Sequence, residues 1–373
     1  MKKRLIALTL IFCTFSICAY AKPAEEPEAE VVVIPSSFSL QEAVEFAQAN
    51  HSAVKTAQAN VTKSDYQYQE AHNAYITSRS KTNEGYSTYE TFLVKDGAYD
   101  QQALSGLNIA KASLNQTREN IKFGVETAYY KCINLKEKQT IAQNSYDSAS
   151  EKLSQAKQQQ AQGLAAPLEV MAAEIAEKRA AADLSKAERD VDSGMLELKN
   201  AIGVPLDTQF TLTTESIETP SLDEMPLADA VELAKAGNLN VIQAKEQLLS
   251  AEKTFSATKK WFTPNTYKFA QTNFAMVSAQ ETYQSAQNAA EVAVHKAYDT
   301  AVSTADNMDI LVASIAYQEK NYEAMKQKYE LGLIAKLDLD NSWYELQQNK
   351  MNLADYHYNC YLTVRQYQLS YTI

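Results

Sequence analysis

Two carboxylates occupy matching positions in the chain, each shortly after a Gly-Leu pair. Glu169 follows Gly163-Leu164, and Asp338 follows Gly332-Leu333 at the same interval. Carboxylates that are brought close together repel one another and attract cations. The matching positions therefore indicate that the two carboxylates share one role. The alternative interpretation is that each is an ordinary solvated side chain in a first helical turn, stabilised there by the helix dipole.

Other residue patterns that support chemistry are missing from the sequence. It contains no nucleophile–base motif, no phosphate-binding loop and no paired-carboxylate cleft. The four histidines have no metal-ligand spacing; they are His51, His72, His295 and His357. We therefore expect no enzyme activity, no catalytic residue, no metal site and no cofactor.

The elements that must position the two carboxylates occur twice. Tyr129 precedes Gly163 by the same interval as Tyr298 precedes Gly332. A spacing held without slippage predicts two long helices joined by a fixed turn, repeated within one chain. The predicted helices are 39–49, 51–80, 101–162 and 167–202 in the first copy, and a short helix that begins at Pro226 followed by 239–262, 266–331 and 336–371 in the second. The two longest must pack laterally as coiled coils, because no ordinary globular domain holds a helix of such length.

The composition agrees with a mainly α-helical protein. The chain has only nine glycines and eight prolines in 373 residues. A short strand is possible at Thr208–Leu212, with Val31–Ile34 as its mate, and a short β-hairpin at Tyr86–Val94. The expected organisation is a signal peptide at 1–21, a flexible acidic leader at 22–38, helical repeats at 39–202 and 226–373, and a linker at 203–225. The first copy is longer than the second somewhere between Ala43 and Ala128.

The charge of the chain argues against two classes of partner. Loss of the three basic residues of the signal peptide takes the net charge from −11 to −14, which weighs against nucleic acid and against anionic membrane surfaces. Export leaves two cysteines, Cys132 and Cys360, at similar distances from their turns, and we favour two core thiols over a disulfide. Tyrosines crowd one end of the first copy, where helix packing is favoured over a membrane-interface girdle: Tyr66, Tyr68, Tyr75, Tyr86, Tyr89 and Tyr99.

The duplicated hairpins with matched turns resemble the TolC family of outer-membrane efflux proteins over residues 39–372. The resemblance rests on Ala128-Tyr129 with Gly163-Leu164 and Glu169, and on Tyr329 with Gly332-Leu333 and Asp338. It implies a homotrimer whose long helices form a tunnel. A periplasmic adaptor and an inner-membrane pump are the implied partners.

The same resemblance implies a role for each residue of the turns. Gly163, Leu164, Gly332 and Leu333 would face the adaptor. Tyr329, Asp338 and Glu169 would form a constriction network, with Asp340 and Asn341 beside it. The chain departs from the family pattern in having Asn341 in place of a second acid, and Ile334 in place of an arginine.

A second departure lies at the other end of each repeat. The connectors 81–101 and 261–265 are too short to supply two membrane strands per copy, so we expect little or no β-barrel. Membrane contact is therefore left open between an outer-membrane-associated and a periplasmic protein of the cell envelope. The leading hypothesis is a trimeric conduit for efflux or secretion. The alternative is a structural coiled-coil protein of the envelope without a transport lumen.

Overall fold

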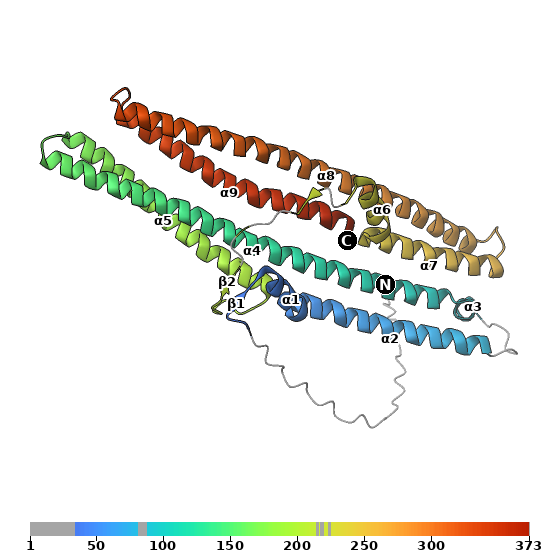
Figure 1. The fold of residues 1–373 in the computed structure, drawn as a ribbon. Helices are drawn as coiled ribbons and strands as arrows, with labels where there is room; N and C mark the ends of the chain where they lie inside the picture. The colour runs from blue at the N-terminus through green and yellow to red at the C-terminus, as the bar shows by residue number, and fades with distance from the viewer. Residues whose placement is uncertain (1–33, 81–87, 214–215, 217–219, 223–224, 373) are drawn as a thin grey trace, which may run out of the picture. The chain divides into compact units, whose positions relative to one another are not determined.

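The computed structural model describes residues 34–80, 88–213, 216, 220–222 and 225–372. The chain divides into two units, Met1–Pro35 and Ser36–Ile373, and the account below concerns the second. Its first half contains α1 (Leu40–Asn50), α2 (Ser52–Ser80), α3 (Tyr89–Asp96), α4 (Ala98–Ala161) and α5 (Pro167–Ile202). Its second half contains α6 (Leu227–Gly237), α7 (Leu239–Trp261), α8 (Tyr267–Glu330) and α9 (Lys336–Thr372). The predicted mainly helical fold is confirmed (Figure 1).

The internal repeat is visible in the lengths of corresponding helices. α4 and α8 each have 64 residues, and each begins at the same interval before the glycine of its turn. The extra length of the first copy lies at one end of the repeat, because α2 has 29 residues against 23 in α7. In addition, α3 and its flanking segments stand between α2 and α4, whereas only a short turn joins α7 to α8. These two differences together account for all of the extra length.

Local sequence signals set the helix ends. Ser39 caps α1 through a capping box, in which its side chain accepts the Glu42 N–H and the Glu42 carboxylate accepts the Ser39 N–H. Pro167 stands at the first position of α5, where a missing N–H costs nothing. α5 ends at Gly203, whose φ is 83° and whose Cβ, if present, would approach the His51 ring at 3.2 Å. The left-handed φ favours glycine there, and any side chain would also require the His51 ring to shift by a few tenths of an ångström.

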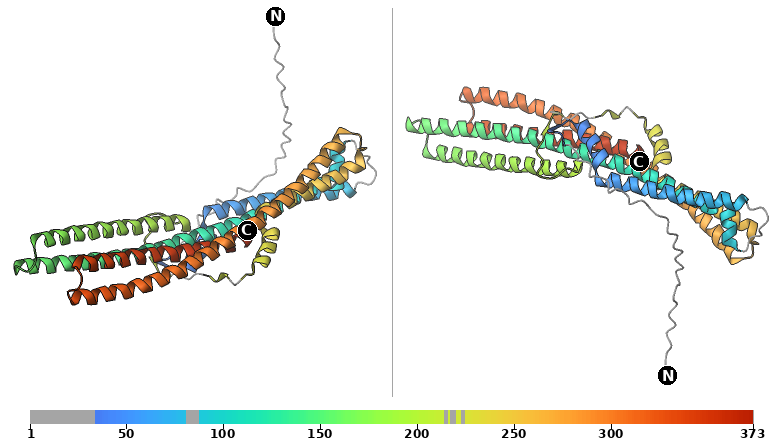
Figure 2. Two further views of the ribbon diagram at one scale, coloured as in Figure 1. Left: turned by 90° about the horizontal axis from the view of Figure 1, so that it is seen from above. Right: turned by 90° about the horizontal axis from the view of Figure 1, so that it is seen from below.

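Within this unit the helices form a single curved layer, four across. In the half that contains the Gly-Leu turns, the order is α5, α4, α9, α8, since α4 contacts α5 and α9, and α8 contacts α9 (Figure 2). In the other half, α2 and α7 take the places of α5 and α9, giving the order α2, α4, α7, α8. The long helices α4 and α8 run through both halves. The layer therefore has two different edges, one made by α5 and α2, the other by α8.

The middle of the layer holds the main cores. α6 packs on α8 and α9, where Val294, Val364 and Tyr367 are fully buried. In the first copy, the buried Tyr129 donates its hydroxyl hydrogen to the backbone oxygen of Phe38 at 2.9 Å. Phe38 also packs edge-on against Phe210, with ring centroids 5.0 Å apart. These contacts hold the start and end of the first repeat together.

The strand prediction is correct in part. β2 (Thr211–Leu212) forms within the segment that we expected to be a strand, but its partner is β1 (Ser37–Phe38). The two strands are parallel, with Ser37 opposite Thr211 and Phe38 opposite Leu212. The expected mate is Val31–Ile34, of which residues 31–33 lie outside the described part. Phe38, at the end of the expected leader, pairs here because its side chain is buried against Phe210.

The β-hairpin considered for Tyr86–Val94 is not what the described residues form. Residues from Tyr89 onward are helical in α3, while 81–87 lie outside the described part. Thr88 caps α3 by accepting the Thr91 N–H, and the Thr91 hydroxyl in turn accepts the Thr88 N–H. Gly97, with φ 81°, ends α3 and leads directly into α4. No helix in the described part is both long and apolar enough to cross a membrane.

Candidate functional site

The two Gly-Leu turns have the same backbone geometry. Gly163 has φ 74° and donates its N–H to the Gln160 oxygen at 2.9 Å, while the Leu164 N–H reaches the Gln159 oxygen at 2.8 Å. In the second turn Gly332 has φ 72°, and its N–H bonds to the Tyr329 oxygen at 2.9 Å. Each pattern closes the C-terminal end of the long helix with a glycine in the left-handed region. A side chain at either glycine would be strained.

The leucines of the turns point into solvent. Leu164 is 75% exposed and Leu333 is 69% exposed. Leu168 and Leu331 beside them are exposed to a similar degree. Apolar side chains gathered on an exposed turn indicate contact with another protein, because they do not contribute to the core of this chain.

The paired carboxylates occupy the same place in their helices. Glu169 is the third residue of α5, and Asp338 is the third residue of α9. The Glu169 N–H bonds to the Ala166 oxygen at 3.0 Å, and the Asp338 N–H bonds to the Ala335 oxygen at 3.1 Å. Both are exposed, and among the described residues neither carboxylate forms an ion pair. The helix dipole stabilises both where they stand, and both carry free charge at the turn end.

Two of the other predicted residues lie on exposed surface near the turns. Tyr329 lies in the last turn of α8, where its backbone oxygen accepts the Gly332 N–H and its ring is partly exposed. Asn341 is exposed on α9. Asp340 is different, because it points toward the other hairpin.

Asp340 forms an ion pair that joins the two hairpins. Lys152 of α4 donates from Nζ to Asp340 Oδ1 at 2.6 Å, and both side chains are about a quarter exposed (26% and 24%). The same ammonium lies 4.9 Å from the ring centroid of Trp343 and 5.8 Å from that of Tyr344. A cation over aromatic faces gains further electrostatic stabilisation. We call this group, Lys152 with Asp340, Trp343 and Tyr344, the inter-hairpin clasp.

Two further polar contacts follow the same α4–α9 interface away from the turns. Lys138 pairs with Asp355 at 2.9 Å, and Arg365 pairs with Glu126 at 2.7 Å. The Arg365–Glu126 pair is largely buried. Burial, followed by the Glu126 charge, raises the pKa of nearby Tyr361 above its usual value. The interface is therefore tied at three levels by opposite charges.

Sequence reasoning missed the clasp, although the comparison made for the cysteines would have found it. The interval from Cys132 to Gly163 is three residues longer than the interval from Gly332 to Cys360. In the same way, the interval from Lys152 to Gly163 is three residues longer than the interval from Gly332 to Asp340. Antiparallel helices in one register give this constant difference. Both cysteines are free and buried, and burial raises the pKa of Cys132 to about 12.

The arrangement shows no catalytic or metal-binding geometry among the described residues. No group of three or more His, Cys, Asp or Glu side chains gathers there to hold a metal ion. A groove of about 530 Å³ lies over α4 between α5 and α9, with Ala176 and Ala180 on one wall and Met351 on the other. Charged groups of both signs surround it, including Arg179 and Asp183, with no nucleophile–base pair.

Comparison with known proteins agrees with this geometry. Residues 98–204, less than a third of the chain, match the family described as outer membrane efflux protein. The CmeC outer membrane channel of Campylobacter jejuni matches the structure with a TM-score of 0.72 at 13% identity, covering 89% of this chain and 85% of that one. The fold of the chain is TolC-like. This confirms the resemblance that the turns indicated.

Other solved structures show the same TolC-like fold. VceC, an outer membrane protein of Vibrio cholerae, has a TM-score of 0.67 at 14% identity, covering 89% of this chain and 96% of that one. The MtrE outer membrane channel of Neisseria gonorrhoeae has a TM-score of 0.65 at 15% identity, covering 89% and 88%. No curated protein matches the sequence. At these identities the likeness establishes the fold.

The family match covers one TolC-like hairpin. It takes in α4, the turn at Gly163-Leu164 with Glu169, and α5. The second hairpin, with Gly332-Leu333 and Asp338, belongs to the same site through the internal repeat and through the clasp.

Proposed function

We propose that this protein is the subunit of a trimeric TolC-type conduit in the cell envelope, used for efflux or secretion. A periplasmic adaptor would bind the Gly-Leu turns, and an inner-membrane pump would load the conduit. The match to outer membrane efflux proteins and the TolC-like fold support a channel of this class. The main observation in favour of a ring assembly is that the two edges of the helical layer, α8 on one side and α5 on the other, differ from each other and both expose apolar side chains.

The α8 edge bears a line of exposed apolar side chains along most of its length. Phe274, Val292 and Ile310 are all exposed and follow one another at equal intervals in the sequence. That interval is five turns of an α-helix, at about 3.6 residues per turn, so these three side chains share one face. Ile310 is 67% exposed. A face of this kind on a 64-residue helix has no partner among the residues that the structure describes, and it indicates an interface.

The opposite edge bears a second line, on α5. Leu168, Ile175 and Leu196 are exposed and stand at multiples of seven positions from one another. A seven-residue repeat is the spacing of a coiled-coil seam. Ile175 is 53% exposed. The α5 edge is therefore suited to receive another long helix.

Two different edges associate head to tail. Such an interface joins one surface of a protomer to a different surface of the next, and it produces a ring when the rotation closes. Four helices from each of three protomers would give a ring of twelve. The number three follows from the TolC-type assembly.

In such a ring the turn ends of three protomers converge. Glu169 and Asp338 would then supply six carboxylates around one opening, with Tyr329 and Asp340 beside them. Crowded carboxylates select cations and resist passage of anions. The exposed Leu164 and Leu333 would lie on the outer rim, where apolar side chains can pack against the adaptor.

The test is the size, shape and conductance of the purified protein. Light scattering should give a trimer, and electron microscopy should show a ring with a solvent-filled lumen. Assembled with its adaptor and pump, the protein should form a path that passes cations in preference to anions. A monomeric or dimeric rod with a dry core would contradict the conduit and would favour a coiled-coil spacer of the envelope.

A further inference from the structure

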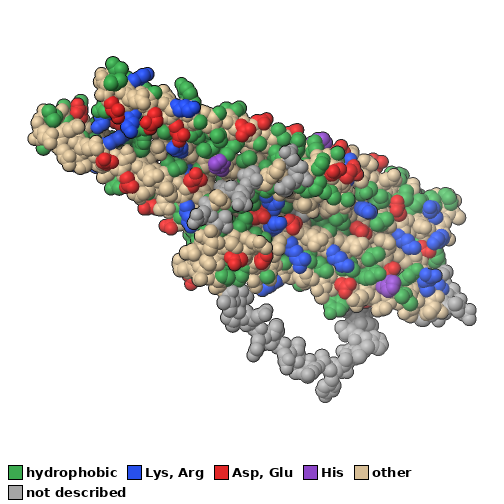
Figure 3. Space-filling model, viewed as in Figure 1, with side chains coloured by type: hydrophobic (Ala, Val, Ile, Leu, Met, Phe, Trp, Pro, Cys, Tyr) green, Lys and Arg blue, Asp and Glu red, His purple; other side chains and the backbone are tan. Residues whose placement is uncertain are grey.

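The end of the layer opposite the Gly-Leu turns has an unusual charge for this protein. Residues 253–280 contain four lysines and no aspartate or glutamate, although the whole chain has a net charge of −11. They form the end of α7, the short turn 262–266 and the start of α8. Several Lys and Arg side chains are visible over this end in the space-filling view (Figure 3). A local basic patch on an acidic protein indicates a partner with negative charge.

Aromatic side chains surround these lysines. Phe92 packs on Trp261 with ring centroids 5.2 Å apart, and Tyr89 packs on Phe262 at 5.0 Å. On the other side of the turn, Phe255 packs on Phe269 at 5.2 Å. The cluster is not closed off from solvent, because Trp261 remains 36% exposed and the nearby Tyr267 is 97% exposed.

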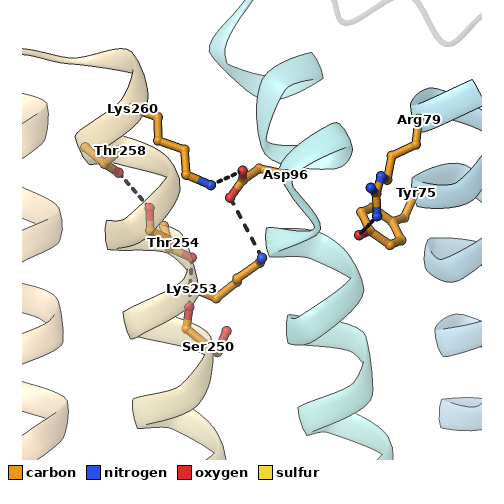
Figure 4. A network of polar contacts seen from close by, with 8 residues as sticks. All are labelled: Tyr75, Arg79, Asp96, Ser250, Lys253, Thr254, Thr258 and Lys260. Carbon is orange, nitrogen blue, oxygen red and sulfur yellow. Dashed lines mark hydrogen bonds and ion pairs between the residues drawn. The ribbon is translucent and has the colours of Figure 1, made fainter. Parts of the chain in front are cut away.

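The lysines at this end have two distinct roles. Lys253 and Lys260 both face Asp96 at the end of α3, at 3.9 Å and 2.5 Å, and so bind α3 to α7 (Figure 4). The Tyr89 hydroxyl adds a hydrogen bond of 2.7 Å to the Thr258 hydroxyl. These contacts make the end a fixed structure.

Lys259 and Lys268 have no such ion pair among the described residues. The Lys259 ammonium lies 4.9 Å from the ring centroid of Phe255, and the Lys268 ammonium lies 5.9 Å from that of Tyr89. Both side chains are exposed at the end of the layer. We call Lys259, Trp261, Tyr267 and Lys268 the basic aromatic end.

We propose that the basic aromatic end docks on the surface of a phospholipid bilayer that contains anionic lipids. Tryptophan and tyrosine favour the boundary between headgroups and acyl chains, since one part of each ring is apolar and another part is polar. Lysines beside them bind anionic headgroups, and their long stems allow the ammonium to stay in the headgroup layer. The acidic remainder of the chain is repelled by the same surface, so the protein stands on this end.

A protein partner fits these residues less well. Interfaces between proteins are depleted in lysine at their centre, where charge would have to be desolvated. At this end Lys259 lies over the ring of Phe255 and Lys268 lies over the ring of Tyr89, while both ammonium groups stay exposed. A headgroup surface leaves the ammonium groups hydrated and gives the exposed rings of Trp261 and Tyr267 an apolar boundary to enter.

The test is co-sedimentation of purified protein with vesicles. Vesicles of phosphatidylglycerol mixed with phosphatidylcholine should bind the protein, and vesicles of phosphatidylcholine alone should bind it much less. The variant K259Q/K268Q should weaken the partition coefficient by at least about tenfold, since each lysine near an anionic surface contributes about fivefold. Tyr267→Ser should weaken binding to the mixed vesicles without changing the fold, because this side chain makes almost no contact within the chain.

Matched controls lie on the same long helix, toward the turns. Lys320, Lys326 and Tyr317 are exposed on α8, so K320Q/K326Q and Tyr317→Ser change the same residue types far from this end. The controls should bind mixed vesicles like the wild type. Equal binding by the wild type and K259Q/K268Q would overturn the proposal. Loss of self-association in Tyr267→Ser, with vesicle binding unchanged, would overturn it also and would assign this end to a contact between protomers. Because no adaptor or channel measurement is involved, these outcomes are separate from the test of the conduit.

Discussion

Lys152 of α4 and Asp340 of α9 meet at 2.6 Å, and this pair is the ion pair between hairpins that lies nearest to the turns among the described residues. Beyond it toward the turns, Glu169 and Asp338 stand without an ion-pair partner. The turn end of the two hairpins thus carries two carboxylates without an ion pair, beyond one clasp that joins the hairpins. We expect the clasp to set how far the two hairpins separate.

Breaking the clasp should loosen the turns and leave the rest of the fold intact. Lys152→Met and Asp340→Asn should each destabilise the protein modestly, and a double-mutant cycle should give a coupling of about 1 kcal/mol, as expected for a partly exposed pair. Conductance of the assembled pore should rise in both variants. The exchanged pair K152D/D340K should restore part of the coupling. A coupling of zero would show that the Lys152–Asp340 pair does not control how far the two hairpins separate.

Neutralising the paired carboxylates should change ion selectivity. In E169Q/D338N the pore should lose preference for cations and show greater leak, because six fewer negative charges would remain in the trimer's opening. The measurement is the reversal potential in a salt gradient. E188Q/E281Q, which neutralises two exposed acids distant from the turns, is the matched control. Unchanged selectivity in E169Q/D338N would assign both carboxylates to helix-dipole stabilisation alone.

Charge placed on either apolar edge should stop assembly. Ile310→Glu on α8, or Ile175→Glu on α5, would put a carboxylate in the buried seam between protomers, where it has no partner. We expect monomers of normal helical content by light scattering and circular dichroism, because both side chains are exposed in the protomer. Ile310→Leu keeps the edge apolar and should assemble normally. Trimers of Ile310→Glu would exclude this edge from the interface.

Removing one partner of the buried pair should cost more than removing both. Arg365→Met would leave the Glu126 carboxylate largely buried without its cation, at a cost of about 3–5 kcal/mol. E126Q/R365M removes both charges and should be considerably more stable than the single variant. The measurement is the free energy of unfolding in urea. If both variants lose equal stability, the packing of Arg365 would matter more than its charge.

The buried thiols should react only when the chain unfolds. Burial raises the pKa of Cys132 from 9.0 to about 12 and raises the pKa of Cys360 as well. Thiolate is the reactive form, so iodoacetamide should label neither residue in folded protein at neutral pH, and both in urea. Above pH 9 the unfolded chain releases these protons and the folded chain retains them. Stability should therefore fall between pH 9 and about 12, and less steeply in Cys132→Ala.

The repeat and its helices could be predicted because they follow from local signals. Ser39 with Glu42, Gly203 before Pro205, and the two Gly-Leu turns are all visible in the sequence, and the structure shows helix ends within three residues of the predicted ones. α3 was missed because its capping pair is Thr88 with Thr91, which lacks the Glu or Gln that marks the usual motif. Its aromatic residues also read as strand formers.

The clasp and the strand partner depend on which elements come together in space. Asp340 could be named from its place beside the turn, but Lys152 lies 188 residues away and is recognised only when the two hairpins are set in register. In the same way, Ser37–Phe38 pairs with β2 because Phe38 is held by Phe210 and Tyr129. Tertiary packing decides such pairings, and short apolar runs do not contain the information.

The length of α8 has a mechanical consequence. Its 64 residues include neither glycine nor proline, so nothing in its sequence provides a hinge. At about 1.5 Å per residue it is a stiff rod about 96 Å long. A sideways displacement of its Leu333 end therefore tilts the whole rod about its middle, where α6 holds it. In a ring, opening at the turns would therefore be a rigid-body tilt of each long helix, and the opposite end of the helix would have to move at the same time.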